Sequence, residues 1–116
     1  MRYSLMVLAV VTLAEGWLSL SAWANPAHEK LAGMSEIDRS EALAIFVESS
    51  GQPCRTVART FFQGFDAKGN AIWNVECAGG QSYVVQLKND RDGSTRVIRC
   101  QTLHAAGGGT CFRKLD

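Results

Sequence analysis

The sequence predicts a small α+β domain in which one N-terminal amphipathic helix packs on a four-stranded antiparallel β-meander and disulfides cross-link the chain. Three observations predict it. Apolar residues recur at helical spacing over residues 35–50, and the apolar period changes to two after Cys54. Four cysteines occur in a chain of 116 residues, a density typical of small exported domains.

Residues 1–24 have the order of parts of a secretory signal peptide. One arginine precedes an uncharged, mostly apolar run at 5–14, and Ala22-Trp23-Ala24 offers small residues at a cleavage site. The run is too short for a membrane helix, which needs about 20 residues. Extending the run to the length of a membrane helix would bury Glu15, at a free-energy cost of about 2.5–3.5 kcal/mol. We expect cleavage after Ala24 and a periplasmic or extracellular location, with an uncleaved anchor as the alternative.

Residues 25–34 are expected to be a flexible leader, and 35–116 a single domain with a Gly-rich tail. Ser35 is a suitable helix N-cap, with Glu36 and Asp38 in the first turn, where negative charge suits the helix dipole. Gly51 and the proline after it end the helix. Its apolar face comprises Ile37, Leu43, Ala44, Phe46 and Val47.

Four period-two segments follow, at 55–65, 71–77, 82–88 and 95–100. Clusters of Asp, Asn and Gly separate them, and these residues favour turns. The second segment alternates most clearly, with Trp73 and Val75 on a dry face and Asn74 on a wet one. In the first segment we expect Val57, Phe61 and Phe65 on the core face, which leaves Phe62 on the other.

The cysteines favour one disulfide pairing among three. In a meander, Cys54, Cys77 and Cys100 gather at one edge of the sheet. A disulfide needs Cα atoms about 4.4–6.8 Å apart, and neighbouring strands lie about 4.8 Å apart, next-nearest strands about 9.6 Å. We therefore favour Cys54–Cys77 with Cys100–Cys111, the three glycines at 107–109 letting Cys111 reach its partner. The other two connectivities stay open.

No catalytic, cofactor or metal site is expected. The gaps between the cysteines are 22, 22 and 10 residues, unlike the closely paired ligands of structural zinc sites. His104 lies near Cys100 and Cys111 in sequence, so a thiol- or metal-dependent activity is kept as an alternative. The acidic clusters do not complete a calcium loop and are explained as turns, at Asp66, Asn70, Asn89, Asp90 and Asp92.

The charge balance argues against a nucleic-acid partner. Of 12 basic and 11 acidic residues, Arg2 and Glu15 fall within 1–24, so the remaining chain carries 11 − 10 = +1. Binding to a polyanion through phosphate contacts needs a basic surface. No stable membrane insertion is expected after cleavage. The candidate partner surface comprises Phe62, if exposed, together with Arg59 and Arg96.

A helix followed by a strand meander resembles the small PepSY-like domains of exported bacterial proteins. The residues that carry the resemblance cover about half of the chain. They are Ser40-Glu41-Ala42-Leu43-Ala44-Ile45-Phe46, Gly51, Trp73-Asn74-Val75-Glu76-Cys77, Tyr83-Val84-Val85 and Asp92-Gly93-Ser94-Thr95-Arg96-Val97. The resemblance implies a non-catalytic module that holds or inhibits partner proteins, often peptidases.

The sequence as a whole predicts a small exported, non-enzymatic module that binds or inhibits another exported or envelope protein. One alternative is an accessory subunit of an envelope protein complex. The other is the thiol- or metal-dependent activity at the cysteines and His104.

Overall fold

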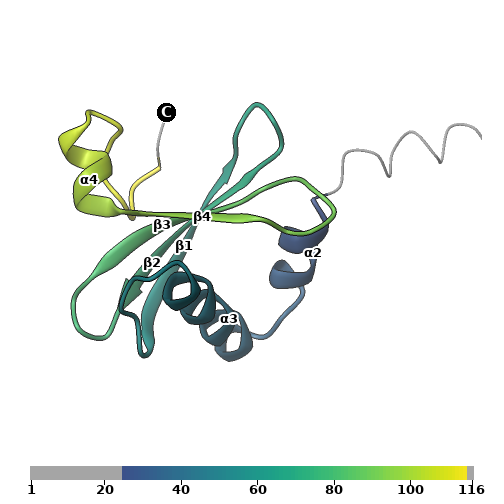
Figure 1. Ribbon diagram of the computed structural model, residues 1–116, viewed down its shortest axis with the longest axis horizontal. Helices are drawn as coiled ribbons and strands as arrows, with labels where there is room; N and C mark the ends of the chain where they lie inside the picture. Colours follow the sequence, from purple (N-terminus) through teal and green to yellow (C-terminus); the bar gives the residue numbers. More distant parts are fainter. Residues whose placement is uncertain (1–24, 115–116) are drawn as a thin grey trace, which may run out of the picture.

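The structure, a computed structural model, describes residues 25–114 as a four-stranded antiparallel sheet with helices on both faces (Figure 1). The strands lie in the order β1-β2-β3-β4. The α+β class and the antiparallel sheet are confirmed. The elements are α2 (Pro26–Ala32), α3 (Glu36–Ser49), β1 (Val57–Phe65), β2 (Ala71–Cys77), β3 (Ser82–Leu87), β4 (Thr95–Arg99) and α4 (Cys100–Ala105).

The segment expected to be a flexible leader is a helix, so that prediction is wrong. Asn25 caps α2, since its Oδ1 accepts a hydrogen bond from the backbone N–H of His28. Its Nδ2 donates to the carbonyls of Gly69 and Leu87, which ties the helix to two strand ends. Leu31 is buried in the core, and burial of such a side chain contributes about 1.5–3 kcal/mol. The expectation of a single helix is therefore also wrong.

Helix α3 begins as its sequence predicts. The Ser35 hydroxyl accepts a hydrogen bond from the N–H of Asp38, and the helix ends at Ser49 with Ser50 as its C-cap. It lies across one face of the sheet (Figure 1). Ile37, expected on the apolar face, is 71% exposed, because only the later turns of α3 meet the core.

The hydrophobic core fills the layer between the sheet and these two helices. Side chains from α2, α3, β2 and β3 are buried there, and the hydroxyl of Tyr83 donates a hydrogen bond to the carbonyl of Pro53. The largest of the fully buried side chains are Tyr83, Leu31, Leu43, Leu87 and Val47.

Strand β1 is bulged twice, and the bulges overturn one prediction. The register with β2 shifts between Val57 and Arg59, and an inserted residue reverses which side chains face the core. Phe62 therefore lies opposite Trp73 on the core face, while Phe61 faces the other way. The expectation that Phe61 points inward and Phe62 outward is wrong.

The second bulge lies between Phe62 and Gly64. Gly64 has a φ of 115°, a backbone conformation that residues with a Cβ rarely adopt. The extra residue returns Phe65 to the face of Phe62, and the two rings meet edge to face at 5.4 Å. Phe65 stays 55% exposed at the end of the strand.

Both favoured disulfides are confirmed. Cys54–Cys77 joins the entry of β1 to the end of β2, with Cα atoms 5.4 Å apart. Cys100–Cys111 has Cα atoms 5.9 Å apart and returns the C-terminal segment to the sheet. Cys100 begins α4 instead of ending the fourth strand.

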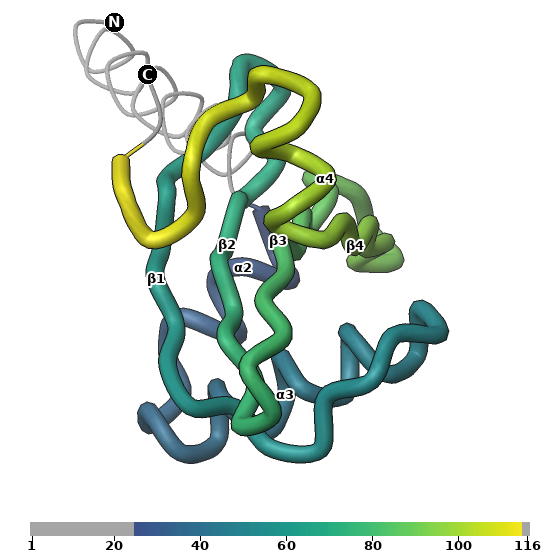
Figure 2. Tube along the Cα trace, turned by 90° about the vertical axis from the view of Figure 1, so that its left-hand side faces the viewer, coloured from purple at the N-terminus to yellow at the C-terminus, as the bar shows by residue number. Residues whose placement is uncertain are grey.

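The helices are divided between the two faces of the sheet. Figure 2 shows α4 and the C-terminal segment on the side opposite α2 and α3. Within residues 25–114, no helix is long and apolar enough to cross a membrane. The predicted signal peptide at 1–24 lies outside the described residues.

Candidate functional site

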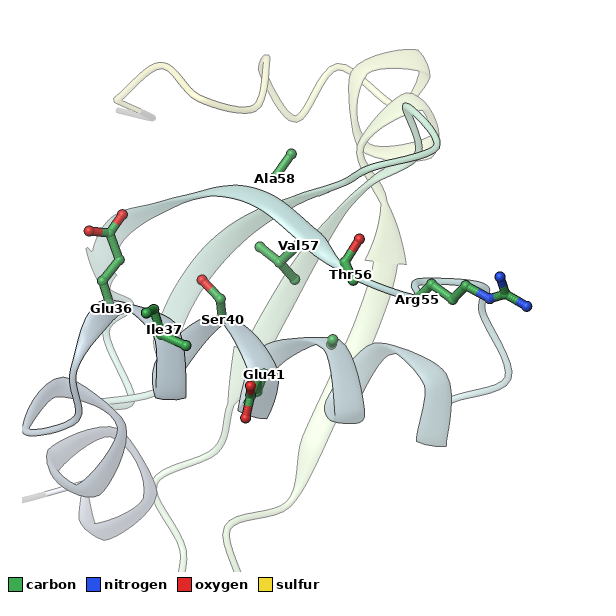
Figure 3. Close-up of a pocket in the computed structure, with 9 residues that line it drawn as sticks. Glu36, Ile37, Ser40, Glu41, Arg55, Thr56, Val57 and Ala58 are labelled. Atoms are coloured by element: carbon green, nitrogen blue, oxygen red, sulfur yellow. The ribbon is translucent and has the colours of Figure 1, made fainter.

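A groove of about 360 Å³ lies between α3 and the start of β1 (Figure 3). It runs alongside an edge strand of the sheet, since β1 has a neighbour on one side only. Its lining residues are Glu36, Ile37, Ser40, Glu41 and Ala44 from α3, and Arg55, Thr56, Val57 and Ala58 from the strand side.

The groove exists because the side chains between α3 and β1 are small. Leu43 and Val47 anchor the helix in the core. Ser40 and Ala44 lie on the side of the helix next to β1, where they leave the space unfilled. Ser40 and Val57 point toward one another across the gap in Figure 3. The floor is therefore largely apolar, and the rim is polar.

The charged groups of the groove carry no ion pair within residues 25–114. Glu36 and Glu41 are exposed carboxylates on the helix wall, and Arg55 lies at the opposite end (Figure 3). Arg39, the basic residue of α3, is engaged elsewhere. Its guanidinium donates to three backbone carbonyls at the end of α2 and lies 5.7 Å from the ring centroid of Trp73.

Beside the groove, the outer edge of β1 offers backbone groups to a further strand, as edge strands do. The far end of that edge is closed, because the ammonium of Lys114 donates to the carbonyl of Gln63. The bulge at Gly64 also interrupts it. The open stretch is residues 57–62, which begins with the first bulge, and its first two residues, Val57 and Ala58, border the groove.

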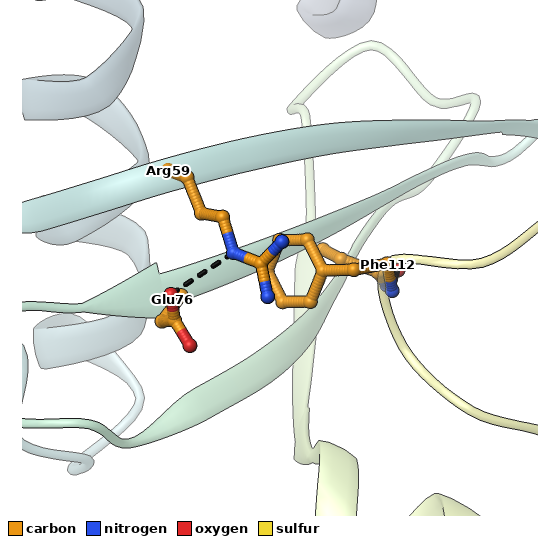
Figure 4. Close-up of polar contacts among 4 residues, drawn as sticks. Arg59, Glu76 and Phe112 are labelled. Atoms are coloured by element: carbon orange, nitrogen blue, oxygen red, sulfur yellow. Dashed lines mark hydrogen bonds and ion pairs between the residues drawn. The ribbon is translucent and has the colours of Figure 1, made fainter.

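Arg59 lies on the other face of the sheet and is held in place there (Figure 4). Its Nε is 2.9 Å from Oε1 of Glu76. Its guanidinium carbon lies 3.9 Å from the ring centroid of Phe112. Both contacts orient the side chain over the sheet and away from the groove.

Residues 112–114 form a strap across that face. The N–H of Phe112 donates to Oδ1 of Asn74 at 2.8 Å. The side-chain amide of Gln63 donates to the same oxygen at 2.7 Å and to the carbonyl of Arg113 at 2.6 Å. Phe112 has a φ of 62°, the one positive value among the non-glycine residues of 25–114. The strap is thus fixed by directional bonds.

Asn74 was expected on a wet face, but it is fully buried beneath the strap. Its Nδ2 has no hydrogen-bond partner within the described residues, and an unpaired group of this kind costs about 1–3 kcal/mol. Alternation alone could not show this burial, because the covering chain comes from residues more than thirty positions away.

The predicted partner residues Phe62, Arg59 and Arg96 do not form one surface. Phe62 is partly buried against the core and stacks on His28, with ring centroids 4.7 Å apart. Arg96 is exposed on β4, the edge strand opposite β1. It borders a polar hollow between the two hairpin turns, which Lys68 also lines.

His28 is a structural histidine of the core. It is 7% exposed, and its Nδ1 accepts a hydrogen bond from the indole N–H of Trp73 at 3.3 Å. Burial lowers the pKa of this imidazole, and the charge of Glu29 opposes that shift. The neutral ring therefore belongs to the folded state.

The cysteine and histidine residues near the C-terminus offer no thiol. Every cysteine of the chain is in a disulfide. His104 is exposed on α4, and its ring approaches the Thr110 hydroxyl at 3.5 Å. Within residues 25–114 there is no group of three metal-ligating side chains. The thiol-dependent alternative therefore has no nucleophile.

Asp66 organises the turn between β1 and β2. Its carboxylate accepts hydrogen bonds from the N–H groups of Lys68 and Asn70 and from the side chains of Asn70 and Gln86. Desolvation raises its pKa, but these hydrogen bonds outweigh it and hold the pKa below its ordinary value.

No family model, curated protein or solved structure matches this chain. The resemblance to PepSY-like domains therefore stays a prediction.

Proposed function

We propose that this chain is an exported, non-enzymatic module that holds a partner protein in the groove between α3 and β1. The observation that carries the proposal is the conjunction of an apolar floor, unpaired charges at the rim and an open strand edge. In this proposal α3, lying on one face of the meander, is the rigid wall of the groove.

The disulfides support both the location and the rigidity. Two disulfides indicate an oxidising compartment, as does the signal peptide expected at 1–24. Cys54 lies directly before the strand wall of the groove, and its bond to Cys77 fixes that wall to the sheet. A wall fixed in this way loses little conformational entropy when a partner binds.

An exposed apolar side chain at the groove also supports a partner surface. Ile37 lines the groove, is 71% exposed and does not contribute to the core. A large apolar side chain exposed at a groove is typical of protein-binding surfaces.

Site-specific photocrosslinking in the envelope of the source organism tests this proposal. A benzophenone amino acid replaces Ile37 in one variant and Thr102 in the control, which is exposed on α4 across the sheet. We expect one discrete adduct from position 37 that the Ser40→Phe change abolishes by filling the groove. Equal adducts from both positions, or none from position 37, would contradict it.

The lifetime of the complex with the partner distinguishes an accessory subunit from a module that binds or inhibits its partner transiently. A subunit stays with one large partner through purification. An inhibitory module binds reversibly, and its addition slows the partner's activity.

A further inference from the structure

The groove has a polarity that specifies what it binds. We propose that it takes an extended peptide segment of the partner, added antiparallel to β1, with a basic residue, then an aliphatic residue, then an acidic residue at every second position. This inference rests on the proposed function and adds the chemistry of the bound segment.

The first step is the mode of binding. Residues 57–62 form the open part of the edge. Beyond the bulge between Val57 and Arg59, every second residue of this edge points its N–H and C=O outward. An extended segment satisfies these groups by adding a fifth strand. The other three strand pairs are antiparallel, and antiparallel pairing is the more stable arrangement.

The second step is the order of charges. Helix α3 runs from Glu36 toward the end of the groove where Arg55 lies, and β1 runs the opposite way (Figure 3). A segment antiparallel to β1 therefore enters at the Glu36 end and leaves at the Arg55 end. Its basic residue meets Glu36 first, and its acidic residue meets Arg55 last.

The third step is the spacing. Alternate residues of an extended strand lie on one face, about 6.8 Å apart, so the first and fifth are separated by about 13.6 Å. Glu36 and Ser40 are four residues apart on the helix, or about 6 Å, which is close to the spacing of the first and third residues of the segment. The middle side chain then lies over the apolar floor at Val57, which faces Ser40 across the groove (Figure 3).

The carboxylates on the helix wall are free to pair with a basic residue of the bound segment. Glu36 and Glu41 have no cationic partner within residues 25–114, so a basic ligand residue displaces no existing ion pair. Arg39, the nearest cation on α3, is committed to backbone carbonyls. Complementary charge at both ends sets the register of the segment more than its affinity.

The test uses a blocked, fluorescein-labelled peptide, Gly-Lys-Thr-Val-Thr-Asp-Gly, and its reversed sequence as a control of the same composition. The oxidised protein recovered after export is titrated at low salt, and fluorescence polarisation is measured. We expect the forward peptide to bind at least about tenfold more tightly than the reversed one. Equal affinity of the two peptides, or no binding of either at millimolar concentration, would overturn the inference.

Two sets of variants locate the binding. Glu36→Lys combined with Glu41→Lys should weaken the forward peptide about tenfold and abolish its advantage over the reversed one. Glu48→Lys is the matched control, because Glu48 is exposed on the same helix but does not line the groove. Ser40→Phe fills the groove and should abolish binding of the forward peptide. Binding unchanged by the double charge reversal would contradict the inference.

The outcomes separate this inference from the proposed function. If position 37 crosslinks a partner but the two peptides bind equally, the groove binds proteins and the assigned charge order is wrong. If position 37 yields no adduct, the proposed function falls.

Discussion

The two faces of the sheet are covered in different ways. Beneath α2 and α3 the side chains are aliphatic and aromatic, and many have no exposed surface. Beneath α4 and the strap, the central buried residue is Asn74, held to Phe112 and Gln63 by hydrogen bonds. One cover is maintained by apolar burial, the other by directional contacts and the Cys100–Cys111 disulfide.

The face that contributes most to the stability of the fold is also the face that leaves a groove open for a partner. The helical face supplies most of the hydrophobic stabilisation, yet it remains open at its margin, where Ser40 and Ala44 meet β1. The strapped face buries less apolar surface and is closed along β1 by Phe112 and Lys114. Phe112 and Lys114 thus cover part of β1 on the strapped face, and the groove lies on the helical face.

The largest effect is expected from a cavity in the helical face. Leu43→Ala removes a fully buried side chain and should lower the free energy of unfolding by about 2–5 kcal/mol. Urea denaturation measures this change. Ile45→Ala, on the exposed side of the same helix, is the control and should stay within about 0.5 kcal/mol. Equal losses from the two variants would contradict the assigned core.

Removing each disulfide in turn tests whether the two covers of the sheet stabilise the fold to different extents. Loop-closure entropy gives about 3.4 kcal/mol for the 23-residue separation of Cys54–Cys77 and about 2.8 kcal/mol for the 11-residue separation of Cys100–Cys111. Paired Cys→Ser variants, measured by thermal unfolding, should follow this order. Loss of the second bond should also leave the helical face intact. A larger loss from the second pair would show that the strap carries the fold.

The strap itself depends on Asn74. Asn74→Ala removes the acceptor of the Phe112 N–H and should cost about 1–3 kcal/mol. Amide exchange at Phe112 should accelerate more than exchange at Val85 on the helical face. Ser82→Ala is the control, because Ser82 is half-exposed and pairs with Glu76 on the neighbouring strand. It should change the exchange rate of neither amide. Equal acceleration at Phe112 and Val85 would contradict a separable strap.

The smallest effect concerns pH and the helical face. Burial lowers the pKa of His28 in the folded state below 6.5, so the unfolded chain binds this proton more readily. The contribution of His28 is complete above pH 6.5 and is lost as pH falls from 6.5 toward the lowered folded pKa. Urea midpoints between pH 7.5 and 5.5 should show this loss. His28→Gln keeps an acceptor for Trp73 but should lack the pH step.

The sequence was sufficient where one local rule governs the structure. Ser35 caps α3, the turn clusters join antiparallel neighbours, and the strand order selects Cys54–Cys77 over Cys77–Cys100. The start of α2 was also readable, because Asn25 followed by Pro26 is a helix N-terminus signal.

Other features depend on distant parts of the chain. A bulge next to Val57 exchanges the faces of Phe61 and Phe62, and no residue type in that stretch announces the shift. The burial of Asn74 requires a strap that returns through Cys111. The groove arises from the separation of α3 and β1, which side-chain periodicity does not specify.

Residue-resolved amide exchange with and without the forward Lys-Thr-Val-Thr-Asp peptide tests the central claim most directly. We expect bound peptide to slow exchange within residues 57–62 and to leave exchange at Thr95–Arg99, the opposite edge strand, unchanged. Slowing at Thr95–Arg99 or at Phe112, with none at 57–62, would show that β1 is not the binding edge.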